Sequence, residues 1–137
     1  PGSPPLPLDK VASGGELARA MLALRLVLVD AGEGPGDSPS TLIFDEVDAG
    51  VGGAAATAVG RALADLGAHH QVLVVTHLAQ VAAAATHQVV VTKRVEGGAT
   101  FTDVAPVTGD TRVAEVARML AGDESRAAVA HARQLLD

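Results

Sequence analysis

The chain contains no cysteine, tryptophan or tyrosine, and its only phenylalanines are Phe44 and Phe101. Without cysteine it can form neither disulfide bonds nor thiolate metal sites, which is typical of a cytoplasmic protein. With so few aromatic rings, the core must consist of alanine, valine and leucine, since 48% of the residues are hydrophobic. A chain of 137 residues can bury roughly two-thirds of its unfolded surface, as one domain or part of one.

Long apolar runs and excess positive charge are also missing. Arg19 and Arg25 interrupt the most hydrophobic stretch before it reaches the ~18 residues of a membrane span, and no signal-peptide pattern is visible. The formal net charge is −6, whereas a nucleic-acid-binding surface needs clustered lysine and arginine. We therefore expect no membrane contact, and we expect any contact with DNA to lie outside this stretch.

Proline is concentrated at the beginning of the chain. It stands at positions 1, 4, 5 and 7, and the chain starts with proline rather than methionine. This composition is typical of a linker or of the edge of an excised segment. The pattern predicts a proline-rich entry over residues 1–10 and one folded part over residues 11–137.

A short glycine-containing motif, Ser13-Gly14-Gly15-Glu16, precedes an apolar stripe with helical spacing from Leu17 to Val29. The Ser-x-x-Glu pattern predicts a capping box at the start of this helix. The two glycines lack Cβ atoms, so the backbone amides of the helix start could also approach a phosphate, which the helix dipole favours. A well-capped helix and an anion-binding helix start both fit these residues.

The run Thr41 to Phe44 predicts a buried strand, which ends abruptly at the carboxylates Asp45 and Glu46. If the strand persists to its end, these two side chains point to opposite faces. One could then hold a hydrated Mg²⁺ while the other orients a water. These are the two roles of the acids in the Walker B motif of a nucleotide hydrolase. A strand that ends in a turn with solvated acids is the other interpretation.

Glycines follow this strand, and an alanine-rich helix is predicted from them to about Leu66. Gly50, Gly52 and Ala55 match the Gly-x-Gly-x-x-Ala pattern of a dinucleotide-binding site. That interpretation expects an acid at the end of the next strand to bind ribose, but the next strand ends at His77. It also leaves the preceding pair of acids beside a negatively charged pyrophosphate.

The apolar run from Val72 to Thr76 predicts a parallel strand covered on both faces. His77 directly follows it. A histidine at this position can hydrogen-bond a phosphate or an attacking water, or it can serve as a local structural partner.

The last third of the chain carries no catalytic pattern. Glycine and aspartate residues at turns and helix ends predict a short helix, a hairpin that turns at Glu96-Gly97-Gly98, and two final helices. Their expected ranges are residues 78–85 for the short helix, 88–95 and 100–104 for the strands, a helix capped by Asp110, and a helix over residues 125–136. Lys93 and Arg94 are expected to be solvated charges.

Three motifs therefore stand in order: the serine-glycine helix start, the acid-ended strand and the strand-end histidine. This order resembles the signature motif, the Walker B strand and the switch histidine of an ABC-type ATPase head, with Asp48 to Gly53 similar to the D-loop region. Glu16 stands where transporter ATPases usually have glutamine, and Val47-Asp48 stands where they have Pro-Thr, so the chain resembles the SMC-like branch.

Longer strings narrow the resemblance. VASGGELARAMLAL, FDEVDAGVGG, QVLVVTHLAQVAA and ARMLAG resemble the RecN family of bacterial DNA repair proteins, over nearly everything from Leu6 onward. Gly52 replaces the aspartate that usually closes the D-loop, and RecN-like sequences share this Gly-Val-Gly-Gly run. The role of the D-loop in communication between subunits is therefore open for this chain.

The resemblance implies an α/β fold of the P-loop NTPase type. The chain would be the C-terminal half of an ABC or SMC-like head, with a largely parallel sheet, a β-hairpin and flanking helices. No Walker A motif is present, because neither Lys10 nor Lys93 follows a glycine. In the resembled family that motif and a long coiled coil lie earlier in the chain.

By the same resemblance, ATP and Mg²⁺ are sandwiched between two heads of a homodimer, and hydrolysis opens the dimer. The implied site residues are the trans-acting signature Ser13, Gly14, Gly15 and Glu16, the Mg²⁺ residue Asp45, the catalytic Glu46 and His77, and the D-loop residues Asp48, Gly50 and Gly52. Implied partners are the N-terminal Walker A lobe of the same protein, a second head, and DNA bound through other parts.

The resemblance places the protein in the cytoplasm, in association with the nucleoid, and implies a role in DNA recombination and double-strand break repair. Two other functions remain open at the level of the sequence. One is half of a nucleotide-binding domain of an ABC transporter, and the other is a non-catalytic interaction module on an ABC-like scaffold. Without a Walker A motif, the chain by itself is expected to be inactive as an ATPase.

Overall fold

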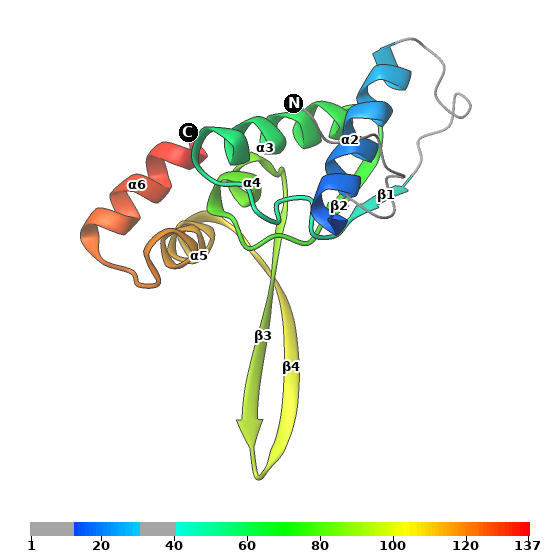
Figure 1. Cartoon of the computed structure of the whole chain (residues 1–137). Helices are drawn as coiled ribbons and strands as arrows, with labels where there is room; N and C mark the ends of the chain where they lie inside the picture. The colour runs from blue at the N-terminus through cyan, green and yellow to red at the C-terminus, as the bar shows by residue number, and fades with distance from the viewer. Residues whose placement is uncertain (1–12, 31–40) are drawn as a thin grey trace, which may run out of the picture. The chain divides into compact units, whose positions relative to one another are not determined.

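The computed structural model describes residues 13–30 and 41–137, and the chain divides into two compact units at the junction between His77 and Leu78 (Figure 1). The proline-rich entry predicted over residues 1–10 and the predicted loop before β1 lie outside the described residues. The elements are α2 (Gly14–Asp30), β1 (Thr41–Phe44), α3 (Gly53–Gly67), β2 (Gln71–Val74), α4 (Ala79–Ala84), β3 (Gln88–Glu96), β4 (Ala99–Val107), α5 (Gly109–Ala121) and α6 (Arg126–Leu136).

The first unit contains a parallel strand pair, as the sequence predicts. β1 and β2 pair in register from Thr41 opposite Gln71 to Phe44 opposite Val74, and the Val75 amide donates to the Phe44 carbonyl at 2.9 Å. Helix α3 connects the two strands and buries Leu63 and Leu66 together with smaller residues. This is the crossover helix that parallel strands require.

The predicted burial of these strands is wrong for one face of the pair. Ile43, Leu73 and Val75 are 70%, 48% and 63% exposed, whereas Phe44 is buried. Along both strands, exposed and covered positions alternate, as they do when only one face of a pair is packed. In the part of the chain that the structure describes, the other face of this strand pair is open.

The second unit begins with α4 and contains the predicted hairpin, which is longer than its sequence pattern suggests. β3 and β4 pair antiparallel over nine residues each, and Gly97 and Gly98 turn the chain with φ values of 60° and 80°. Both values lie in the left-handed region, which favours glycine in tight hairpin turns. Figure 1 shows the hairpin as a twisted ribbon that extends away from α5.

One face of the hairpin carries a charged cluster. Arg94 was expected to be only solvated, but its side chain donates to Asp103 at 3.0 Å and to Glu96 at 2.5 Å. Its guanidinium also lies 5.0 Å from the centre of the Phe101 ring. The contacts with Asp103 and Phe101 connect the two strands, although exposed ion pairs contribute little to stability.

Helices α5 and α6 pack around small residues, and the buried core of this unit contains Ala79, Val116, Ala117, Ala128 and Ala132. The predicted helix is confirmed as α5, but its predicted cap is wrong. Thr108 caps α5 in a capping box with Thr111, whereas Asp110 lies in the first turn. No helix among the described residues is long and apolar enough to cross a membrane.

Candidate functional site at the ends of the parallel strands

The start of α2 forms the predicted capping box. The Ser13 amide donates to Glu16 Oε2 at 2.7 Å, and the Glu16 amide donates to Ser13 Oγ at 3.3 Å. Hydrogen bonds from the Ser13 amide and hydroxyl, helped by the charge of Arg19, lower the pKa of Glu16. The negative charge is therefore fixed within the first turn, where the helix dipole favours it.

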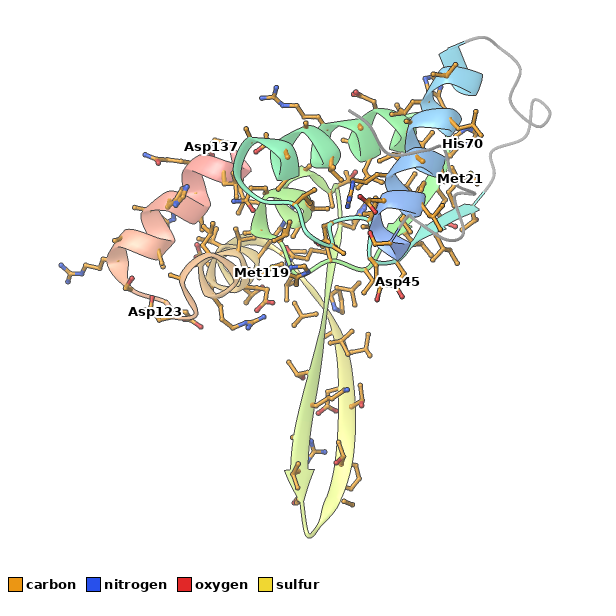
Figure 2. All side chains as sticks on the ribbon, in the orientation of Figure 1. Met21, Asp45, His70, Met119, Asp123 and Asp137 are labelled. Atoms are coloured by element: carbon orange, nitrogen blue, oxygen red, sulfur yellow. The ribbon has the colours of Figure 1, made fainter. Side chains whose placement is uncertain are left out.

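The two glycines of α2 lie against the chain that follows β1. A Cβ atom on Gly15 would come within 2.9 Å of Ala49 Cβ and 3.0 Å of the Glu46 carbonyl oxygen. A Cβ atom on Gly14 would lie 3.0 Å from Glu46 Oε2. Figure 2 shows Asp45 at the end of β1, close to the beginning of α2. The serine-glycine helix start and the acidic pair thus share one site.

The two acids do not sit on a strand, because β1 ends at Phe44. The alternation of faces that applies to a continuing strand therefore does not separate Asp45 from Glu46. Glu46 instead adopts φ 58°, and it is the only non-glycine residue with positive φ in the described part of the chain. Such a backbone costs on the order of 1–3 kcal/mol and persists only where its surroundings hold it.

The segment Glu46–Ala49, which we call the acidic turn, is closed by a hydrogen bond from the Ala49 amide to the Glu46 carbonyl at 3.0 Å. Arg19 of α2 also holds it. Arg19 Nη1 donates to the Ala49 carbonyl at 2.7 Å and to the Val47 carbonyl at 3.3 Å. Val47 is fully buried, so the turn is anchored on both its backbone and its side chain.

Asp48 connects the acidic turn to the end of β2. Its carboxylate is 1% exposed, and Oδ2 accepts hydrogen bonds from the Thr76 hydroxyl and from the His77 amide, the latter at 3.2 Å. His77 Nδ1 lies 3.4 Å from the same oxygen, while 72% of the histidine side chain is exposed. A buried carboxylate needs such partners, and here they fix the residue that follows the second strand.

The glycines after the acidic turn have different backbone roles. Gly50 has φ 72°, in the left-handed region, and Gly53 at the start of α3 has φ 54°. Gly52 caps α3 with an extended backbone, at φ −162°, which any residue adopts. Only Gly50 and Gly53 therefore need to be glycine for backbone reasons.

No group of three histidine or acidic residues in the described ranges is arranged to hold a metal ion. A magnesium ion in a nucleotide site commonly uses one or two carboxylates and takes its other ligands from water and phosphate. The exposed Asp45 at the strand end fits such a partial site. It does not form a complete protein cage.

Sequence patterns did not identify Arg19 as part of the site, nor Asp48 as a partner of His77. Arg19 stands three residues after Glu16 in a largely apolar helix, and this charged position was the available signal. The partner of Asp48 had no local signal, since Thr76 and His77 lie 28 and 29 residues further along the chain.

The structure is an α/β fold with a parallel strand pair and an antiparallel hairpin. No protein-family model matches the chain. The chain is 55% identical over 136 residues to the DNA repair protein RecN of Deinococcus radiodurans, covering 99% of this chain and 23% of that protein. The corresponding protein of Mycobacterium leprae is 56% identical over 134 residues, and that of Vibrio cholerae is 44% identical over 137 residues.

Over the segment that it spans, the chain is similar to RecN proteins. That segment is 22% of the M. leprae protein and 24% of the V. cholerae protein, so the chain spans less than a quarter of these relatives. A solved structure described for the ATP-driven dimerization and DNA-stimulated activation of SMC ATPases has a TM-score of 0.49 and 21% identity. The match covers 80% of this chain and 62% of that chain.

Proposed function

We propose that this chain is the C-terminal, signature-bearing lobe of the ATPase head of a RecN-like DNA repair protein. The observation that carries the proposal is the close packing of the glycine-rich start of α2 on the acidic turn. Gly15 leaves no room for a Cβ atom there, and Gly14 lies beside the Glu46 carboxylate. The chain shares about half of its residues with RecN proteins that are named for DNA repair, at 55% and 56% identity.

In this proposal the start of α2 binds the γ-phosphate of an ATP molecule held by a second head. Ser13 supplies a hydroxyl, and Gly14 and Gly15 supply amides at the positive end of the helix dipole. The lowered pKa of Glu16 keeps a negative charge in the same turn, engaged by Ser13. Ser13 therefore exchanges its contacts with Glu16 for contacts with phosphate when the two heads pair.

The strand ends supply the hydrolytic groups. Asp45 would hold Mg²⁺ through water, and the positive charge of the ion would be supplied against the phosphates. Glu46 orients and polarises the water that attacks the γ-phosphate, and His77 contacts the phosphate that is transferred. Asp48 fixes the backbone of His77 by accepting a hydrogen bond from its amide.

The remaining parts of the site come from outside this chain. A Walker A lobe of the same protein cradles the phosphates, because this chain has no Gly-Lys-Ser/Thr motif. Two heads form a homodimer around ATP, with Asp48, Gly50 and Gly52 at the D-loop between them. Other parts of the protein bind DNA during recombinational repair in the cytoplasm, at the nucleoid.

The test is Glu46→Gln in the full-length protein. ATP turnover is expected to fall roughly a hundredfold or more, the usual worth of a catalytic base, while ATP binding is retained. Steady-state hydrolysis and equilibrium nucleotide binding measure the two effects separately. Glu124→Gln is the matched control, because Glu124 is an exposed glutamate in the other unit and should leave turnover unchanged. Normal turnover of the Glu46→Gln protein would refute the proposed role.

A further inference from the structure

Arg19 occupies an unusual place for an arginine on a largely apolar helix. It is half-buried and lies four residues after Gly15, on the same face of α2. Its guanidinium donates hydrogen bonds to backbone carbonyls of the acidic turn, those of Val47 and Ala49, rather than to carboxylates. The guanidinium therefore ties one helix to the backbone of a turn 28 to 30 residues further along the chain.

The turn that it holds contains the left-handed Glu46. A non-glycine residue with φ 58° needs external support, because the backbone relaxes toward negative φ when the surrounding contacts are lost. Val47 is the next residue, and Ala49 closes the turn by donating its amide to the Glu46 carbonyl. The two carbonyls bound by Arg19 thus lie one and three residues after the strained residue.

The opposite side of the turn is anchored independently. Asp48 accepts hydrogen bonds from Thr76 and from the His77 amide, and these keep the turn on the end of β2. Loss of Arg19 would leave that anchor in place but would weaken the Ala49–Glu46 hydrogen bond, because α2 would no longer hold the turn. The expected effect is therefore a local release of Glu46 and Val47 rather than unfolding of the unit.

We propose that Arg19 is a positioning residue that holds the backbone of the acidic turn so that the Glu46 carboxylate has a fixed place beside the start of α2. This inference rests on the proposed function of Glu46. It adds that the helix start and the acidic turn move as one body, because the same guanidinium joins α2 to the turn. A phosphate bound at the helix start would then affect the placement of the carboxylate through Arg19.

The test compares Arg19→Met, Arg19→Lys and the control Arg61→Met in the full-length protein. Methionine keeps an unbranched apolar stem but removes every donor, whereas lysine retains a charge and can reach a carbonyl. Arg61 is an exposed arginine of α3, outside both the acidic turn and the start of α2. Turnover, ATP affinity and hydrogen exchange of residues 46–51 are measured for each protein.

Arg19→Met is expected to lower kcat roughly ten- to a hundredfold, as displaced catalytic groups do, with an unchanged Kd for ATP. Exchange of the Ala49 and Val51 amides should rise, while α3 keeps its protection. Arg19→Lys should recover part of both losses, and Arg61→Met should behave as the unmodified protein.

Unchanged exchange of residues 46–51 in Arg19→Met would overturn the inference, whatever the turnover. If exchange rises but kcat holds while Glu46→Gln is inactive, Arg19 supports the turn without positioning the carboxylate, and the inference fails alone. Normal turnover of Glu46→Gln would instead remove the proposed function itself. Exchange that rises throughout α2 and α3 would show general unfolding and would also count against a positioning role. If Arg19→Lys then restored the fold without restoring kcat, the positioning role would be refuted directly.

Discussion

Neighbouring glycines at the start of α2 meet very different surroundings. Gly15 is buried, and a side chain there would collide with Ala49 Cβ and with two backbone oxygens, at 2.9 to 3.1 Å. Gly14 would meet only the end of the Glu46 side chain, which can rotate away. The acidic turn therefore approaches α2 through Gly15, whereas Gly14 borders the carboxylate.

Gly15→Ala is expected to destabilise the chain by about 1–3 kcal/mol relative to Gly14→Ala, the usual cost of overpacking. Alanine also raises helix propensity by up to about 1 kcal/mol, but both substitutions share this gain, so the pair isolates the contact. Denaturant unfolding followed by circular dichroism gives the two free energies of unfolding. Equal stabilities would mean that α2 does not pack on the acidic turn as described.

At the scale of elements, the first turn of α2 depends on one ionised side chain. The hydrogen bonds from the Ser13 amide and hydroxyl lower the pKa of Glu16 below its ordinary value of 4.5. The folded form thus binds a proton less readily than the unfolded form, so the stabilisation is present above pH 4.5 and is lost as the pH falls through the lowered pKa.

Amide protection factors in the first turn of α2, corrected for intrinsic exchange, should therefore decrease as the pH falls below 4.5. Glu16→Gln removes the titrating group and should abolish this pH dependence while leaving the remaining turns of α2 unchanged. A pH profile in the variant identical to that of the unmodified chain would assign the effect to another group.

At the scale of the whole molecule, the chain supplies only some of the groups that a nucleotide site needs. It offers acids and a histidine at the strand ends, but its lysines, Lys10 and Lys93, do not follow glycine. The charge balance is also negative, with 16 acidic residues against 10 lysines and arginines. A triphosphate would therefore meet carboxylates without the lysine and backbone cradle that usually bind it.

The chain alone is expected to show no saturable ATP binding in an equilibrium titration with Mg²⁺ present, and no hydrolysis above background. The full-length protein serves as the positive control, because there the Walker A lobe is available. Stoichiometric binding of ATP by the isolated chain would contradict the division of the site between two lobes.

Local sequence determined the elements and the residue types at the site. Helical spacing predicted α2, and an alanine-rich composition predicted α3. The Gly97-Gly98 pair predicted the hairpin turn, and the Ser13–Glu16 pattern predicted the capping box, because each depends on residues only a few positions apart. The parallel strand was predicted from the continuous apolar run Val72 to Thr76.

Only the tertiary structure decided how these residues meet. The contacts of Arg19 with the acidic turn and the hydrogen bonds of Asp48 join segments 28 to 30 residues apart. No local pattern encodes these contacts or the left-handed backbone of Glu46. The same applies to the open face of the β1–β2 pair, since apolar strand residues look alike whether or not another layer covers them. Sequence fixes local conformation through neighbouring residues, whereas burial and backbone strain depend on which distant segments pack together.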